Sequence, residues 1–161
     1  MGLARINDAS PEEARRALMS CCGSRRWVEA MLTARPFASV DALHAAATRH
    51  WRALGREDVL EAMSHHPRIG EGHAAAAREA AEQAGAMNAE GGIQAAIADG
   101  NRAYEAHFGH IYLVCASGKS GQELLEILQG RLANDPDTEL GVAAGEQEQI
   151  TRLRLDQLLA K

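Results

Sequence analysis

Residues 120–132 have the sequence SGQELLEILQGRL, which carries both a start signal and a helical repeat. Ser120 is followed three residues later by Glu123, the pattern of a capping box at a helix N-terminus. Apolar residues then recur at helical spacing through Leu124, Leu128 and Leu132. The segment therefore predicts an amphipathic helix, with Asn134-Asp135-Pro136 as its stop.

Similar signals recur along the rest of the chain. Ser10-Pro11-Glu12-Glu13 is another capping box, with proline at the first helical position, and predicts a helix to about Ser20. Further helices are expected around 27–32, after Ser39, around 59–63, over 74–84 with an end at Gly85, from Ile93 to Phe108 after a weakening at Gly91-Gly92, and over 138–159. Only residues 111–116 lean towards β structure, and we interpret them as a buried connector because one such run cannot make a sheet. The fold class is all-α: one multi-helix bundle of about seven to eight helices, forming a single domain over 1–161.

Length and charge limit the classes of function. A chain of 161 residues can bury a hydrophobic core as one domain. The formal net charge of -5 provides no basic field for nucleic acid or anionic membranes. No apolar run approaches the roughly 20 residues of a membrane span, and the start of the chain lacks a signal-peptide pattern. We expect a soluble protein that binds a small molecule.

Two local patterns point away from other functions and locations. The chain has an odd number of cysteines, Cys21, Cys22 and Cys115, and the first two are adjacent in sequence. This pattern is a poor disulfide framework and favours a reducing cytoplasm. Gly118-Lys119-Ser120 resembles the end of a phosphate loop, but the first glycine of that pattern would fall at Leu113. We therefore expect a cytoplasmic protein without a nucleotide site.

His66 is the first candidate for chemistry. Pro67 disfavours helical geometry at the residue before it, so His66 is expected at a helix-to-loop junction. Gly70 and Gly72 let the following backbone approach a ligand. The imidazole could transfer a proton there, or it could simply bond a carbonyl at the helix end.

A second candidate is the predicted alanine-rich helix. Residues three and four apart share a helix face, so Glu79 lines up with Glu82 and Gln83. These side chains could face a ligand. The alternative is a solvated face on which Arg78 pairs with Glu82.

The last predicted helix contributes an arginine. Arg154 lies between Ile150 and Leu158 on the apolar arc, whereas Arg152 points nearer the opposite side. A guanidinium on such an arc must meet an anion or extend to solvent. The anion could be a substrate carboxylate or an internal glutamate.

Histidine spacing also allows a metal hypothesis. His65, His66, His73 and Glu82 could together serve a metal-dependent hydrolase. Adjacent histidines point in different directions, however, and no HExxH spacing is present. We therefore expect no metal site. A third class, a helical protein-interaction module, remains open if His66 and Arg154 lie far apart.

Taken together, several segments resemble one family in order and spacing. They are Pro36-Phe37, His44-Ala45-Ala46, His66-Pro67-Arg68-Ile69-Gly70, Glu82-Gln83-Ala84-Gly85, Asn101-Arg102-Ala103-Tyr104-Glu105, residues 108–116, Arg131-Leu132-Ala133-Asn134-Asp135 and Arg154-Leu155. The chain is similar to the 2-oxo-4-hydroxy-4-carboxy-5-ureidoimidazoline (OHCU) decarboxylases of urate degradation, and most closely resembles their bacterial branch. The resemblance implies an all-α homodimer that needs no cofactor and converts OHCU to (S)-allantoin and CO₂.

The resemblance also implies roles for individual residues. His66 and Glu82 would be catalytic, with His66 as the acid/base. Substrate would be bound by Pro67, Glu79, Gln83, Phe108, Ile111, Leu113, Val114 and Arg154. One position departs from the family, because Glu79 stands where a serine is common. That departure implies either a changed hydrogen bond to substrate or a local shift in the helix alignment.

Overall fold

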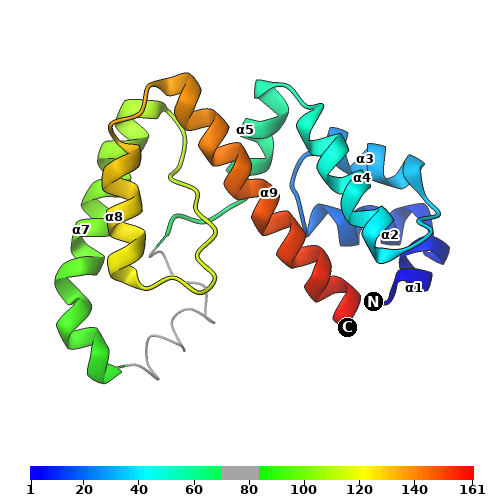
Figure 1. The fold of residues 1–161 in the computed structure, drawn as a ribbon, viewed down its shortest axis with the longest axis horizontal. Coiled ribbons are helices and arrows are strands. Elements are labelled where there is room, and N and C mark those ends of the chain that lie inside the picture. Colours follow the sequence, from blue (N-terminus) through cyan, green and yellow to red (C-terminus); the bar gives the residue numbers. More distant parts are fainter. Residues whose placement is uncertain (70–83) are drawn as a thin grey trace. The chain divides into compact units, whose positions relative to one another are not determined.

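The computed structural model describes residues 1–69 and 84–161, and there the chain is helical without a strand. This confirms the all-α fold class. Eight helices are present in the described ranges (Figure 1). They are α1 (Leu3–Asp8), α2 (Pro11–Met19), α3 (Arg25–Ala34), α4 (Val40–Arg52), α5 (Arg56–Ser64), α7 (Ala84–Phe108), α8 (Gly121–Arg131) and α9 (Pro136–Ala160). Among these helices, none combines the length and apolar character that a bilayer span requires.

Serine caps fix where several of these helices begin. The Oγ atoms of Ser10, Ser24, Ser39 and Ser120 each accept a hydrogen bond from the backbone N–H three residues later. At Ser10 and Ser120 the glutamate side chain reaches back to the cap, so both predicted capping boxes are confirmed. The start of α9 differs from the prediction. Asp135 accepts from the N–H of Thr138 at 3.1 Å, and Pro136 is the first residue of α9, so Asn134-Asp135-Pro136 is the opening of the next helix as well as a stop.

The helix predicted over 74–84 lies outside the described residues except for Ala84, where α7 begins. Within the described residues, α7 corrects the prediction of an end at Gly85 and a weakening at Gly91-Gly92. It runs without a break from Ala84 to Phe108, through all three glycines. Each glycine inside a helix costs about 1 kcal/mol relative to alanine. Gly91 and Gly92 are exposed, with open space where a Cβ atom would lie, so the tertiary support of α7 comes from farther along it, where it packs on α8. The end at Gly109 is as predicted, and its φ of +79° is one that glycine adopts readily.

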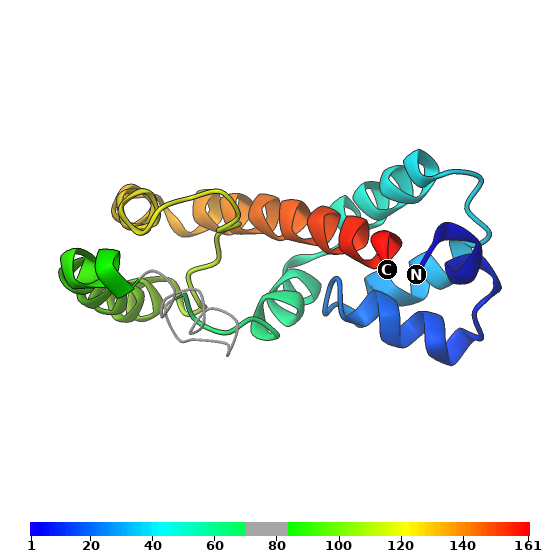
Figure 2. The ribbon, with the colours of Figure 1, turned by 90° about the horizontal axis from the view of Figure 1, so that it is seen from below.

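The described chain divides into two compact units. The first comprises residues 1–65 and 144–161, and the second comprises residues 66–143. In the first unit, α2 packs on α3 and α3 on α4, around a core that includes Trp27 and Leu43. The indole of Trp27 donates to the carbonyl of Ala47, and that of Trp51 donates to the carbonyl of Ala144, at 3.0 Å each. The two chain ends lie beside each other in this unit (Figures 1 and 2), where the Met1 ammonium donates to the Leu158 carbonyl.

The second unit is built on the pairing of α7 with α8, which lie side by side in both ribbon views (Figures 1 and 2). Gly100 allows this close approach, because a Cβ atom there would lie 2.5 Å from Cδ2 of Leu128. An aromatic and aliphatic core fills the interface. Its buried members are Tyr104, Phe108, Tyr112, Val114 and Leu128. This core positions the two segments described next, one before α7 and one after it.

Candidate active site

His66 lies in the loop that follows α5, as the proline after it predicts. Helix α5 ends at Ser64, His66 is half-buried and Pro67 is exposed. His65, the residue before, is placed against Gly23, where an added Cβ would lie 2.6 Å from the Cγ of the His65 ring. The sequence therefore places His66 at the start of the second unit, on a loop whose backbone direction is limited by proline.

The residues directly after Pro67 are attached to α7. The Nε atom of Arg68 donates to both carboxylate oxygens of Glu105 at 2.9 Å. The Nδ2 atom of Asn101 donates to the carbonyl oxygen of Ile69, also at 2.9 Å. The Ile69 side chain packs against the aromatic core. The segment that carries His66 is thus fixed by a charge pair, a hydrogen bond and an apolar contact.

The segment after α7 enters the same core. Phe108, Leu113 and Val114 are buried, and Ile111 is half-buried. The ring of Phe108 lies 4.6 Å from that of Tyr104, centroid to centroid. Residues 110–116 form no regular element, which agrees with the prediction of a buried connector. With Phe108 and Val114 packed into the core, the backbone and Ile111 are the parts of this segment best suited to meet a ligand.

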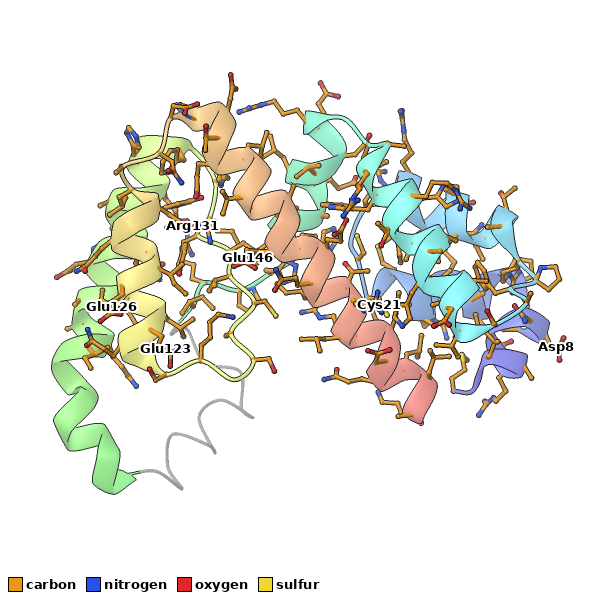
Figure 3. The ribbon with its side chains drawn as sticks, viewed as in Figure 1. Asp8, Cys21, Glu123, Glu126, Arg131 and Glu146 are labelled. Carbon is orange, nitrogen blue, oxygen red and sulfur yellow. The ribbon has the colours of Figure 1, made fainter. Side chains whose placement is uncertain are left out.

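A buried ion pair holds this second segment. Arg131, at the end of α8 (Figure 3), donates through Nε to Glu139 of α9 at 2.6 Å and through Nη1 to the carbonyl of Leu113 at 2.6 Å. The side chains of Arg131 and Glu139 are only 7% and 0% exposed. The hydroxyl of Tyr104 donates to Glu139 at 3.1 Å, and the guanidinium lies 4.9 Å from the centroid of the Tyr112 ring. A charge pair of this kind needs several partners, because burial removes the water that would otherwise solvate it.

Proton affinities in this cluster follow from burial and charge. Burial, and then the nearby Glu139 carboxylate, raise the pKa of Tyr104 well above its ordinary value. Burial is the largest effect on Arg131 and by itself lowers its pKa, but the hydrogen bonds and charge of Glu139 outweigh it and raise the pKa overall. Tyr104 therefore stays neutral and Arg131 stays charged around neutral pH.

The remaining predicted site residues lie either outside the described residues or in the other unit. Glu79, Glu82, Gln83, Gly70, Gly72 and His73 lie outside the described residues. Arg154 is half-buried on α9 in the first unit, with Nη1 3.5 Å from the carbonyl of Ser20, whereas Arg152 is exposed. This difference in exposure agrees with the prediction that Arg154 lies on the apolar face of the last helix and Arg152 nearer the opposite face. His66 belongs to the other unit.

Two hollows lie within the first unit, and neither contains a predicted site residue. Both are lined by His44, Thr48 and Arg152 along α4 and α9. Nε2 of His44 is 2.7 Å from a carboxylate oxygen of Asp156, and Arg52 pairs with Glu148 at 2.9 Å. These two pairs therefore join α4 to α9.

Sequence reasoning missed the groups that support the site. Four side chains hold the two segments that flank α7, and the sequence analysis gave none of them a role. They are Asn101, Glu105, Arg131 and Glu139. One signal was available. Arg131 occupies the apolar arc of residues 120–132, the same feature that drew attention to Arg154.

Among the described residues, the cysteines and the possible metal ligands form no additional reactive or metal-binding site. Cys21, Cys22 and Cys115 are buried and free, and burial raises the pKa of the Cys22 thiol to about 11. A thiol whose pKa is raised in this way is a poor nucleophile at neutral pH. No group of three or more histidine, cysteine or acidic side chains gathers in the described ranges to hold a metal. The metal-hydrolase hypothesis depends on His73 and Glu82, outside those ranges.

Known proteins give this arrangement a context. The chain is 36% identical over 148 residues to the uric acid degradation bifunctional protein TTL of Arabidopsis thaliana, covering 87% of this chain and 45% of that protein. It is 29% identical to the bifunctional protein PucL of Bacillus subtilis, covering 84% of this chain and 28% of that protein. It is 28% identical to the 2-oxo-4-hydroxy-4-carboxy-5-ureidoimidazoline decarboxylase of Haloferax volcanii, covering 80% and 79% of the two chains. The chain thus spans less than half the length of the two bifunctional relatives.

Solved structures agree with these relatives. A crystal structure of OHCU decarboxylase in the presence of (S)-allantoin matches with a TM-score of 0.77 and 33% identity, over 95% of this chain and 100% of that one. A crystal structure of (S)-allantoin synthase, 17% identical, shares the fold with a TM-score of 0.73, over 99% of this chain and 54% of that one. The sequence model described as OHCU decarboxylase matches residues 7–156. The chain belongs to the OHCU decarboxylase family.

Proposed function

We propose that the protein catalyses the decarboxylation of OHCU to (S)-allantoin and CO₂ in urate breakdown. The observation that carries the proposal is the family match over residues 7–156, which includes both segments that flank α7. His66 lies on the first segment, at a position that proline holds outside the helix. The whole chain 1–161 would act as one such domain.

The chemistry requires little from the protein beyond orientation and a proton. As the C–CO₂ bond breaks, its electron pair passes towards the adjacent ring C=N bond, whose nitrogen takes up a proton, and CO₂ leaves an enol. The enol hydroxyl then loses its proton to become the ring carbonyl, and a proton is delivered to the neighbouring ureido-bearing carbon, which gives allantoin. Because the substrate accepts these electrons itself, no organic cofactor is required as an electron sink. A positioned acid or base with a pKa near 6.5, such as histidine, can manage this proton near neutrality.

Each remaining site residue has a proposed task. Glu82 would act with His66 and set its protonation state, since a nearby carboxylate favours the charged imidazole. Gln83 would bond the ureido and ring N–H groups, and Arg154 would hold the anionic substrate. The other proposed binding residues are Pro67, Glu79, Phe108, Ile111, Leu113 and Val114. Glu79 differs in kind, because a carboxylate replaces the hydroxyl that the family commonly has there.

The direct experiment supplies freshly generated OHCU and follows CO₂ release and the handedness of allantoin. The proposal expects release faster than spontaneous decay, with the (S) product in excess. Activity should persist in the presence of a chelator, because the electron sink belongs to the substrate. A racemic product formed at the spontaneous rate would contradict the proposal. Activity lost on chelation and restored by zinc would favour the metal-dependent alternative.

We also propose a homodimer in the cytoplasm, on the resemblance and on the three buried, free cysteines. Light scattering coupled to size exclusion tests the first part, since a chain of 17.3 kDa would elute at twice that mass. A monomer at micromolar concentration would contradict it. Fractionation of the source cells tests the second part.

A further inference from the structure

Helix α7 holds the segment that carries His66 through two polar side chains. Asn101 and Glu105 are four residues apart and therefore share one face of the helix. Asn101 binds the carbonyl of Ile69, and Glu105 binds the guanidinium of Arg68. Two consecutive residues of the loop are thereby attached, and only Pro67 separates them from His66.

The stiffness of proline makes this attachment effective. The ring of Pro67 fixes φ near -65°, so few rotations are available between His66 and Arg68. Ile69 adds an apolar anchor in the aromatic core. On its own, a half-exposed pair such as Arg68–Glu105 contributes little to folding. Three contacts at two consecutive residues nevertheless determine where the backbone of His66 lies.

Asn101 is poorly suited to a purely stabilising role. It is 5% exposed, and its Oδ1 has no hydrogen-bond partner among the described residues. An acceptor buried in this way is unfavourable, which opposes the gain from the Nδ2 bond. What the amide provides is a directed hydrogen bond to Ile69, and hence a defined position for the loop.

We propose that Asn101 and Glu105 are positioning residues of the decarboxylase, which place His66 by holding Ile69 and Arg68. This inference rests on the proposed function, because only a proton-transferring His66 needs such placement. Misplacement of a catalytic group by about 1 Å can cost about 10²-fold in rate. Loosening the loop should therefore lower kcat far more than it changes KM.

The test compares Asn101→Leu and Glu105→Gln with a matched control on the same helix. Asp99 forms an exposed ion pair with Arg102, so Asp99→Asn removes a carboxylate from α7 without touching the loop. Backbone ¹⁵N relaxation at Arg68 and Ile69 reports the attachment independently of activity. Order parameters should be about 0.85 in the native protein and control, and should fall towards about 0.6 in the two test variants.

Steady-state kinetics with OHCU report the consequence of the loosened loop. In the test variants kcat should fall on the order of 10- to 100-fold, the (S) excess should decrease, and KM should change little. Asp99→Asn should keep the native kcat and handedness. Unchanged order parameters, or looser loops with native kcat and handedness, would overturn the proposal. A native protein that does not accelerate decarboxylation would instead contradict the proposed function, whatever the relaxation data show.

Discussion

Glu139→Gln is expected to destabilise the protein strongly, because it leaves the buried Arg131 without its counter-charge. Glu139 is 0% exposed and accepts two hydrogen bonds from the Nε of Arg131, at 2.6 and 3.0 Å, and one from Tyr104. Glutamine has nearly the same shape, so the change removes charge rather than volume. The guanidinium would keep the Leu113 carbonyl and the faces of two tyrosine rings. These neutral groups cannot replace a carboxylate in a site closed to water.

Breaking a buried pair at one partner costs about 3–5 kcal/mol. At about 2–4 °C of Tm per kcal/mol for a chain of this size, the Tm should fall by roughly 6–20 °C. Urea unfolding followed by circular dichroism, together with calorimetry, measures both quantities. Glu12→Gln is the control, because the Arg16–Glu12 pair lies on the surface with both side chains largely exposed, and its loss should cost less than about 0.5 kcal/mol. A joint Arg131→Met and Glu139→Leu change should recover much of the loss, since apolar residues can replace a buried pair. A loss for Glu139→Gln no larger than that for Glu12→Gln would refute the reasoning.

Three further predictions concern the pH dependence of stability, the binding of substrate by Arg154, and Glu79, which stands where the family commonly has serine. The raised pKa of Cys22 means that the unfolded chain loses this proton first, so stability should fall between about pH 8.5 and pH 11. Cys22→Ala should flatten that part of the profile measured by urea unfolding, and an unchanged slope would speak against it. Arg154→Leu should raise KM for OHCU strongly while Arg152→Leu changes it little, and equal small effects would remove Arg154 from the site. Glu79→Ser should keep or improve kcat/KM, because it restores the family's common residue, whereas Glu82→Ala should damage it severely. The reverse ranking would mean that the wrong acid has been assigned.

Local signals in the sequence predicted most of the helices. The serine caps at Ser10 and Ser120 act within one turn of chain and so are visible without tertiary structure. The same local logic failed at Gly85, where a glycine that often ends helices lies inside α7. The close packing of α7 on α8 at Gly100, against Leu128, is a tertiary effect that a local pattern does not contain. The short helix α1 was not predicted, because it has neither a side-chain cap nor an acidic first turn.

The candidate site was predictable only in part, for a related reason. Pro67 marks the position of His66 locally, and the arc of α9 distinguishes half-buried Arg154 from exposed Arg152. The groups that support His66 come from 35 or more residues away, so no local pattern links them to it. The bond from Asn101 to Ile69 and the bond from Arg131 to Leu113 appear only once the second unit is folded. Sequence spacing could indicate which residues have suitable chemistry, but not which of them hold the loops.

His66 is proposed to deliver the proton that forms the C–H bond of allantoin, and a comparison of the native protein with one His66 variant tests this role. Native protein and His66→Asn are each given fresh OHCU in D₂O, and the rate, deuterium position and handedness of allantoin are measured. The native protein should place one deuterium on the ureido-bearing ring carbon of allantoin, with (S) handedness. A folded His66→Asn protein should have a kcat lower by roughly 10²–10⁴, the usual contribution of a positioned acid or base. A folded His66→Asn protein with the full rate and full stereocontrol would remove His66 from the mechanism.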